Sequence, residues 1–463
     1  MMNKCDSLKI FEEIAGVPRP SGKEEKIVSY LVDFATKYNL KYVVQDRNVI
    51  IYKDGTIKGN DKTIILQGHT DMVCEKGINS KINFEKDPIE LIYDGDMLRA
   101  NNTTLGADNG VGVALILHIL KSKDLKHPNI EAVFTCEEET TMYGAKSLDY
   151  SLLKGKTVLS LDGTEEKELE TASAGMVVAT VHKDYKKVNK VVTGYKVSIS
   201  NLKGGHSGGD IHLGRSNANK LLVRLLKKLR YPSIASIEGG DKDNAIPHSA
   251  SVSIVYDDYK SLKKCVNELK KYVIDNNEDD KNVVISVKKV RIKKVYTKKD
   301  SRNIVKMLHD IENGVLEVNE SQFPVTSQNL AKIREIDGID IKVSLRSSIV
   351  EYETKYIDEL KKLCDKCDYI FTINSSAPFF EEKKNSYIVD LCKSTYKKLY
   401  GEDIRSNPVH AGLEGGVFAQ NIKDVDICVM AADLYDIHAI TECASVSSIA
   451  RVEKWLEKIL EEF

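Results

Sequence analysis

The chain has 463 residues, of which 42% are apolar and 30% charged, and its formal net charge is -1. At roughly 100–200 residues per domain this length predicts two to four domains, which excludes a small scaffold held together by disulfides or a structural metal. The apolar content excludes a disordered chain. The balanced charge excludes a global positive field, so nucleic acids and anionic membranes are not expected partners.

The N-terminal segment has no apolar run long enough for a signal peptide, and the apolar window VGVALILHIL is too short to span a bilayer. Nine scattered cysteines fit reduced thiols better than a disulfide framework. We therefore expect a soluble, cytoplasmic protein. The close pair Cys364 and Cys367 has no second pair or histidine at zinc-finger spacing, which favours a helix with two thiols over a zinc site.

Strand-like and helical segments alternate in the first third of the chain. Strands are expected at NVIIYK (48–53), KTIILQGH (62–69), IEAVFTC (130–136) and KTVLSLDG (156–163), and a helix at GVGVALILHILKS (110–122). This alternation predicts an α/β unit around a central sheet. Polar groups at the ends of such strands meet at one edge, which is where open α/β sheets bind ligands.

The middle of the chain differs in composition and in the pattern of its apolar residues. It becomes lysine-rich near residue 184, and a long helix near 216–229 lies among strands, which predicts a separate α+β domain over 184–387. The segment KKVRIKKVYTKK alternates cations with Val and Ile, and we interpret it as the solvated face of an edge strand rather than an anion site. The last segment, 388–463, is expected to rejoin residues 1–183 in the first domain.

Carboxylate and imidazole side chains follow the predicted strands. His69 and Asp71 follow the strand TIILQG, and their i, i+2 spacing in an extended segment places both side chains on one face. A carboxylate beside a ligating histidine orients the ring, which is the role expected of Asp71. Asp108 lies in a glycine-flanked turn that enters the predicted helix, where it could reach two metal ions or act as a helix cap.

Further acidic residues and a late histidine extend this set. The run Glu137, Glu138 and Glu139 follows a predicted strand, with a solvated strand end as the alternative because adjacent carboxylates repel one another. Asp162 ends another strand, with an Asx turn as its alternative, and His438 lies near the C-terminus. Together these side chains supply the oxygen and imidazole ligands, and the unligated carboxylate, that a two-metal hydrolase requires.

The order and spacing of these motifs resemble the co-catalytic zinc peptidases, the family that includes carboxypeptidase G, aminoacylase, carnosinase and bacterial dipeptidases. The matching motifs are HTD at 69–71, LGADNGVG at 105–112, EE with GA at 138–145, LSLDG around Asp162, and the late His438. NLKGGHSGG, NAIPHSA, LRSS and VHAGLEGGVF match outside the metal site. The resemblance covers nearly the whole chain. It implies an α/β, two-domain metallopeptidase with a mixed-sheet catalytic domain and an inserted α+β lid domain.

The resemblance also implies two divalent metal ions, zinc with cobalt or manganese as alternatives. The implied ligands are His69, Asp108 and Asp162 for one ion, and Asp108, Glu139 and His438 for the other. Asp108 would bridge the ions and precede a cis peptide bond, and Glu138 would act as general base. The spacing to Gly144-Ala145 selects Glu138 and Glu139 over Glu137.

In the lid, the resemblance implies that His206 stabilises the oxyanion of the tetrahedral intermediate, with a plain turn residue between paired glycines as its alternative. Asn217 would contact the substrate, with a helix cap as its alternative. Arg346 would clamp the substrate's C-terminal carboxylate, with an exposed strand arginine as its alternative.

The motif HAGLEGG adds further substrate-binding candidates. His410 and Glu414 match the family motif, and Glu414 is expected near the free amine of the substrate. Gly415 and Gly416 would allow the backbone to approach the substrate closely. Cys74 and Cys136, near the predicted ligands, are interpreted as small buried residues rather than soft ligands.

These observations predict a metal-dependent dipeptidase for Xaa-Xaa substrates, with Xaa-His dipeptides among the candidates. The alternatives are a tripeptide aminopeptidase, an N-acyl amino acid deacylase, or a catalytically silent peptide-binding relative. Thr141 and Ile440 replace a glycine and a proline that are usual in the family, which leaves the local loop shapes and substrate preference open. The chain is expected to be a monomer or a homodimer.

Overall fold

The structure, a computed structural model, describes residues 4–463, and the chain divides into two compact units. Unit 1 comprises the chain up to Ser173 with Phe380–Pro408 and Leu413–Phe463, and unit 2 comprises Ala174–Phe379 and Val409–Gly412. Unit 2 begins before the expected boundary at residue 183 because the strand β9 (Gly175–Lys183) pairs within its sheet.

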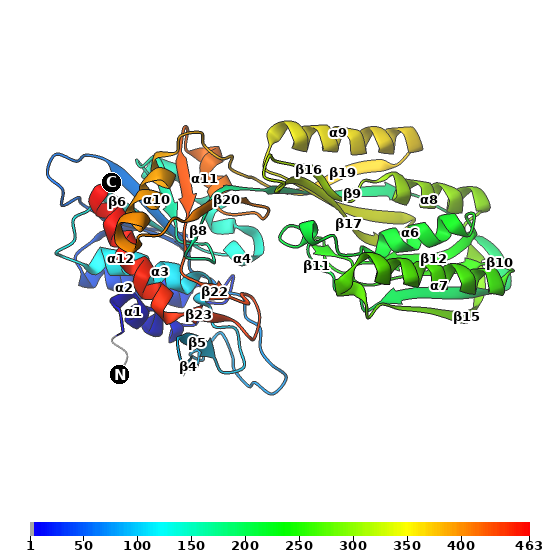
Figure 1. Ribbon diagram of the computed structural model, residues 1–463, viewed down its shortest axis with the longest axis horizontal. Helices are drawn as coiled ribbons and strands as arrows, with labels where there is room; N and C mark the ends of the chain where they lie inside the picture. Colours follow the sequence, from blue (N-terminus) through cyan, green and yellow to red (C-terminus); the bar gives the residue numbers. More distant parts are fainter. Residues whose placement is uncertain (1–3) are drawn as a thin grey trace. The chain divides into compact units, whose positions relative to one another are not determined.

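Unit 1 is built on an eight-stranded mixed sheet (Figure 1). Its order is β1 (Lys41–Gln45), β2 (Asn48–Lys53), β6 (Asn129–Thr135), β3 (Thr63–His69), β7 (Thr157–Ser160), β21 (Asp426–Val429), β8 (Glu168–Ser173) and β20 (Arg405–Val409). The pairs β6–β3, β3–β7 and β7–β21 are parallel, whereas β1–β2, β2–β6 and β21–β8 are antiparallel. The four strands predicted in the first third of the chain are present, and the sheet is mixed as expected.

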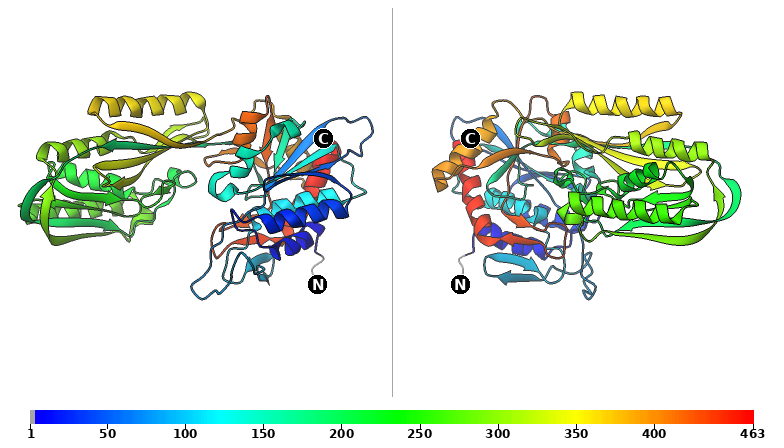
Figure 2. Two further views of the ribbon diagram at one scale, coloured as in Figure 1. Left: turned by 180° about the vertical axis from the view of Figure 1, so that it is seen from behind. Right: turned by 45° about the vertical axis from the view of Figure 1, so that its right-hand side comes forward.

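Helices cover both faces of this sheet (Figure 2). The helices are α1 (Asp6–Ala15), α2 (Glu25–Lys37), α3 (Ala107–Lys121), α4 (Glu138–Thr141), α5 (Tyr143–Ser147), α10 (Tyr387–Tyr400), α11 (Gly415–Asn421) and α12 (Val446–Glu462), with a 3-10 turn η1 (Tyr150–Leu152). Along β3, Ile64 and Leu66 join the core under α1, α2, α3 and α12, whereas Ile65 joins the core under α5 and α11. Alternate strand residues therefore enter opposite cores, as the pleat requires.

A small four-stranded sheet completes unit 1. Its order is β22 (Leu434–Tyr435), β23 (Cys443–Ser445), β5 (Met97–Ala100) and β4 (Leu91–Asp94). The connection between β22 and β23 carries His438, and β23 leads directly into α12. This sheet therefore anchors the loop that holds the last predicted ligand.

Unit 2 contains a nine-stranded antiparallel sheet. Its order is β15 (Val284–Val295), β10 (Val188–Ser200), β14 (Ala250–Val255), β12 (Ser233–Gly239), β17 (Pro324–Arg334), β18 (Ile339–Ser347), β9 and β19 (Ile370–Ala377), with β16 (Gly314–Val318) beside β17. Its helices are α6 (Ala218–Lys228), α7 (Tyr259–Asn276), α8 (Lys298–Asp310) and α9 (Val350–Cys367), and its shorter elements are β11 (Gly205–His206), β13 (Ala245–Ile246), η2 (Ile211–Leu213) and η3 (Glu278–Asp280). The four helices contribute to one apolar core.

Two interpretations of unit 2 are confirmed. The basic segment KKVRIKKV lies in β15, which is the edge strand of its sheet and mostly exposed. Cys364 and Cys367 both lie in α9, as expected for a helix with two thiols. Among the helices of residues 4–463, none is both long and apolar enough to cross a membrane.

Candidate metal centre

The candidate site lies where the parallel strands of unit 1 end. His69 is the last residue of β3 and pairs in register with Thr135, the last residue of β6. Asp162 follows the end of β7, the neighbour of β3 on its other side. Because parallel strands end at the same edge of a sheet, β3, β6 and β7 bring their following residues together.

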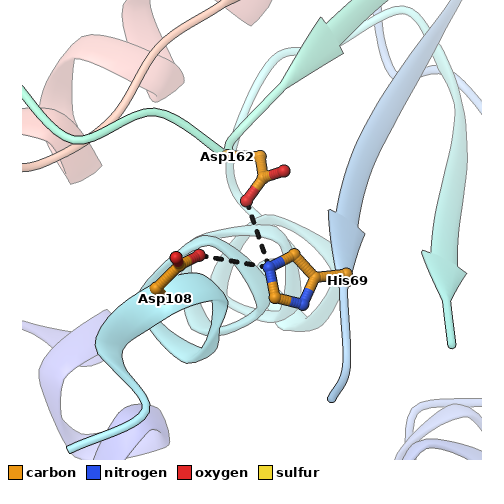
Figure 3. Close-up of side chains that lie close together, drawn as sticks. All are labelled: His69, Asp108 and Asp162. Carbon is orange, nitrogen blue, oxygen red and sulfur yellow. Dashed lines mark hydrogen bonds and ion pairs between the residues drawn. The ribbon is translucent and has the colours of Figure 1, made fainter. Parts of the chain in front are cut away.

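Three of the predicted ligands form a first group (Figure 3). The Nε2 atom of His69 lies 3.1 Å from Oδ1 of Asp108 and 3.3 Å from Oδ1 of Asp162. His69 is buried, with 1% of its surface exposed. One ligand atom from each of the three residues lies within 4.8 Å of the other two. This is a spacing that one metal ion can bridge.

Asp108 also belongs to a second group. Nε2 of His438 lies 3.1 Å from Oδ2 of Asp108 and 3.0 Å from Oε1 of Glu139. The two oxygens of Asp108 are therefore directed to different imidazoles, one to His69 and one to His438. The structure thus brings together all five predicted ligands in two groups that share one carboxylate. The peptide bond between Asp108 and Asn109 is cis, as the resemblance implied.

The negative charges of the carboxylates in this site are compensated by the two imidazoles, whose protonated forms the carboxylates favour. Burial disfavours the charged form of His69, but the carboxylates of Asp162 and Asp108 outweigh it and raise the pKa of His69 well above its ordinary value. Burial is likewise outweighed at His438, where Asp108 and Glu139 raise the pKa to about 10. Divalent cations would replace these protons, and the donor set of imidazoles and carboxylates fits a pair of such ions.

Asp71 connects the first group to the acidic run. Its Oδ1 atom lies 3.4 Å from Nδ1 of His69, on the side of the ring away from Asp108. Its carboxylate also accepts hydrogen bonds from the backbone N–H groups of Glu138, at 3.0 Å, and Glu139, at 3.2 Å. The carboxylate of Asp71 therefore holds the first turn of α4 and faces Nδ1 of His69 at ion-pair distance.

The three glutamates of the acidic run have different surroundings. The Glu137 carboxylate forms an ion pair with Arg47. Within residues 4–463, the Glu138 carboxylate takes part in no hydrogen bond or ion pair. Burial and nearby carboxylates, including that of Asp162, raise the pKa of Glu138 well above its ordinary value although His69 opposes them. A carboxylate with a raised pKa and no partner is suited to accepting a proton.

Comparisons with known proteins agree with this geometry. The model of peptidase family M20/M25/M40 matches residues 65–462. The chain belongs to this family. The cytosol non-specific dipeptidase of Escherichia coli (strain K12) is 31% identical over 473 residues, which cover 98% of this chain and 96% of that protein. The predicted resemblance is thereby confirmed, and the chain is a metallopeptidase.

Two solved structures extend the comparison. The aminoacylhistidine dipeptidase of Vibrio alginolyticus aligns with a TM-score of 0.86 at 28% identity, covering 99% of this chain and 96% of that one. The aminopeptidase PepT of Bacillus cereus ATCC 10987 aligns with a TM-score of 0.58 at 16% identity, covering 99% and 98%. The second likeness is one of fold.

Glu414 is buried in unit 1 of the peptidase, close to the metal centre. Its Oε2 atom accepts hydrogen bonds from Nε2 of Gln67, at 2.7 Å, and from Oγ1 of Thr135, at 2.5 Å. Its Oε1 atom has no hydrogen-bond partner in the described part of the chain, and burial raises the pKa of Glu414 to about 8. Gln67 was not among the predicted site residues, although a polar residue two positions before His69 on an apolar strand is a usable signal.

The glycines after Glu414 have a packing role. Gly415 begins α11 and is buried, and a Cβ atom at this position would come within 2.8 Å of the ring of Phe380. Gly416, the next residue of the helix, is also buried. Close packing of α11 therefore accounts for a glycine at position 415 without any substrate.

In unit 2 of the peptidase, Arg346 is a buried cation. It is 4% exposed, its Nη2 atom lies 3.2 Å from Nε2 of His206, and its Nε donates to Oγ of Ser207 at 3.5 Å. No carboxylate of residues 4–463 forms an ion pair with it, and burial lowers its pKa to about 10. The exposed-arginine alternative is therefore wrong, and the guanidinium is available to an anion.

Asn217 and His410 are engaged within unit 2. The Oδ1 atom of Asn217 accepts the backbone N–H of Lys220 and caps α6, while its Nδ2 donates to the side chains of two asparagines. The helix-cap alternative is thus what the structure shows for Asn217. Nε2 of His410 lies 2.7 Å from Oγ of Ser327, and burial lowers the pKa of His410 to about 3.

Proposed function

We propose that this metallopeptidase is a dipeptidase that hydrolyses Xaa-Xaa substrates, with Xaa-His dipeptides among them. The observation that carries the proposal is the pair of ligand groups that share Asp108, beside the unpartnered carboxylate of Glu138. The similarity to two proteins named as dipeptidases supports the choice of substrate class. Similarity to a protein named as cytosolic supports a cytoplasmic location.

The proposed ligands of two divalent ions are His69, Asp108 and Asp162 for one ion, and Asp108, Glu139 and His438 for the other. When bound, such ions polarise the scissile carbonyl and lower the pKa of an attacking water. Zinc is proposed, and cobalt and manganese suit the same donors.

The remaining steps are assigned to side chains of this chain. Glu138 accepts the proton of the attacking water and delivers it to the leaving amine, because its carboxylate is otherwise unpaired and its pKa is raised. Asp71 holds the ring of His69 in place through Nδ1. His206 donates to the oxyanion of the tetrahedral intermediate.

Recognition of the two ends of a dipeptide is assigned to two buried charged groups. Arg346 binds the C-terminal carboxylate, since its guanidinium lacks an acidic partner among the described residues. Glu414 binds the free amine through the oxygen that has no hydrogen bond. The proposed substrate-binding set is completed by His410, Asn217, Gly415 and Gly416. The capping contact of Asn217 and the packing contact of Gly415 account for these two residues without any substrate.

Hydrolysis of a small panel tests the proposal. Metal-stripped protein is resupplied with zinc, cobalt or manganese and assayed on Ala-His, β-Ala-His, Leu-Leu, Ala-Ala-Ala and N-acetyl-Leu. Metal-dependent cleavage confined to the dipeptides is expected. Cleavage of Ala-Ala-Ala would instead indicate a tripeptide aminopeptidase, and cleavage of N-acetyl-Leu a deacylase. Absence of turnover with every metal would indicate a silent peptide-binding protein.

A further inference from the structure

Glu442 is a buried carboxylate that the proposed mechanism does not use. It is 2% exposed and lies four residues after His438 in the chain. It accepts hydrogen bonds from four successive backbone N–H groups at the start of α3: Leu105 at 2.8 Å, Gly106 at 3.1 Å, Ala107 at 2.8 Å and Asp108 at 3.4 Å. The first N–H groups of a helix have no partner within the helix and favour negative charge. Glu442 therefore caps α3 from a distant part of the chain.

Arg19 holds the same turn from another side. It is 2% exposed, and its Nη1 atom donates to the backbone carbonyls of Thr70, at 3.1 Å, and Asp71, at 3.0 Å. Its Nη2 atom donates to the carbonyl of Gly106. A Cβ atom at Gly106 or Gly110 would come within 2.6 Å of that nitrogen. The glycines that flank Asp108 thus leave room for a guanidinium, which explains their place in the motif.

These contacts bear directly on how Asp108 is placed. Each of its two carboxylate oxygens lies 3.1 Å from one imidazole, that of His69 or that of His438. A rotation of the carboxylate that shortens one of these distances therefore lengthens the other. Arg19 joins the turn before Asp108 to the segment after His69. Glu442 joins the same turn to the loop that carries His438. Each charged side chain therefore links Asp108 to one of the two imidazoles it faces.

We propose that Arg19 and Glu442 are positioning residues that set the affinity of the site for divalent cations by fixing the turn that carries Asp108. This inference rests on the proposed two-ion site. Neither residue ligates an ion or touches the substrate. Groups that orient metal ligands from outside typically contribute about 10- to 100-fold in metal affinity.

Cobalt binding to the full-length, metal-stripped protein tests the inference. Wild type, Glu442→Gln and Arg19→Met are titrated with Co²⁺, and binding is followed by calorimetry and by the visible absorption of the bound ion. We expect each variant to bind Co²⁺ about 10- to 100-fold more weakly than wild type. We also expect an altered absorption spectrum at saturation, because the geometry around Asp108 changes.

Two control variants remove side-chain contacts to backbone groups that do not belong to the turn. Glu131 is a buried carboxylate of unit 1 that accepts the backbone N–H groups of Lys154 and Gly155. Arg334 donates to three backbone carbonyls in unit 2. Glu131→Gln and Arg334→Met are expected to lower the melting temperature as the test variants do, but to leave Co²⁺ affinity and the spectrum unchanged.

The outcomes separate the inference from the proposed function. Unchanged Co²⁺ affinity in both test variants, or an equal loss in the controls, would overturn the positioning role while dipeptide hydrolysis by wild type stands. Co²⁺ binding by wild type without hydrolysis would overturn the dipeptidase proposal alone. If Glu442→Gln does not fold, Glu442→Asp keeps the charge with a shorter reach, and unchanged Co²⁺ affinity in that variant despite a lowered melting temperature would overturn the positioning role.

Discussion

Replacing Glu138 with glutamine separates proton transfer from metal binding. The exchange keeps the size of the side chain and removes its ability to accept a proton. General acid–base catalysis contributes about 10²- to 10⁴-fold, so we expect kcat to fall by that factor. At about 1.36 kcal/mol per tenfold change, this equals about 2.7 to 5.4 kcal/mol of transition-state stabilisation. Metal content should stay unchanged, because the proposed ligand in this run is Glu139, 3.0 Å from His438.

The assay compares three neighbouring glutamates by the same exchange. Turnover of Leu-Leu and metal content by mass spectrometry are measured for Glu137→Gln, Glu138→Gln and Glu139→Gln. Glu139→Gln should lose metal, and Glu137→Gln should keep most activity because Glu137 forms an ion pair with Arg47. Full turnover by Glu138→Gln would refute the assignment of the base. A severe, metal-independent loss in Glu137→Gln would show that the register is wrong by one residue.

Three further predictions concern recognition, metal loading and stability. Arg346→Met should lower kcat/KM for dipeptides by about 30- to 5,000-fold, from about 2–5 kcal/mol for a buried charge pair, and should affect dipeptide amides far less. Because His69 and His438 have raised pKa values, metal binding should release protons and weaken as pH falls, which calorimetry in buffers of different ionisation enthalpy measures. The pKa of His410 is lowered from 6.5 to about 3, so the unfolded state binds more protons between these values. Lowering the pH from 6.5 to 5 should therefore remove about 1.6 kcal/mol of the stability that His410 contributes in urea unfolding, and His410→Gln should lose that part of the pH dependence.

The strands and the helix expected in the first third of the chain are present because they are continuous apolar runs, which become buried on both faces of the strands and all around the helix. The domain boundary is less predictable. The sequence GMVVATVHK of β9 is an apolar, β-branched run like the strands of unit 1. It nevertheless pairs with β18 and β19 in the sheet of unit 2. A strand's pattern reports that one face is buried and does not report which sheet receives it.

The candidate ligands were predictable because each follows a strand or begins a helix within a distinctive motif. The residues that support them were not. Gln67 and Thr135 act through hydrogen bonds to Glu414, which is distant in the sequence, and Arg19 acts through backbone carbonyls. Backbone groups carry no side-chain signature, so a side chain that binds them leaves no pattern in the sequence around its partner.

Asp108 shows how such a distant contact can decide the role of a motif residue. From the sequence, a carboxylate at a glycine-rich helix start is equally a cap and a metal ligand. The N-cap residue Gly106 has φ of 69° and no side chain to accept the free N–H groups. Glu442 accepts them instead, and this leaves both oxygens of Asp108 directed toward His69 and His438. The bridging of two ions proposed for Asp108 would therefore depend on Glu442 as much as on the position of Asp108 itself.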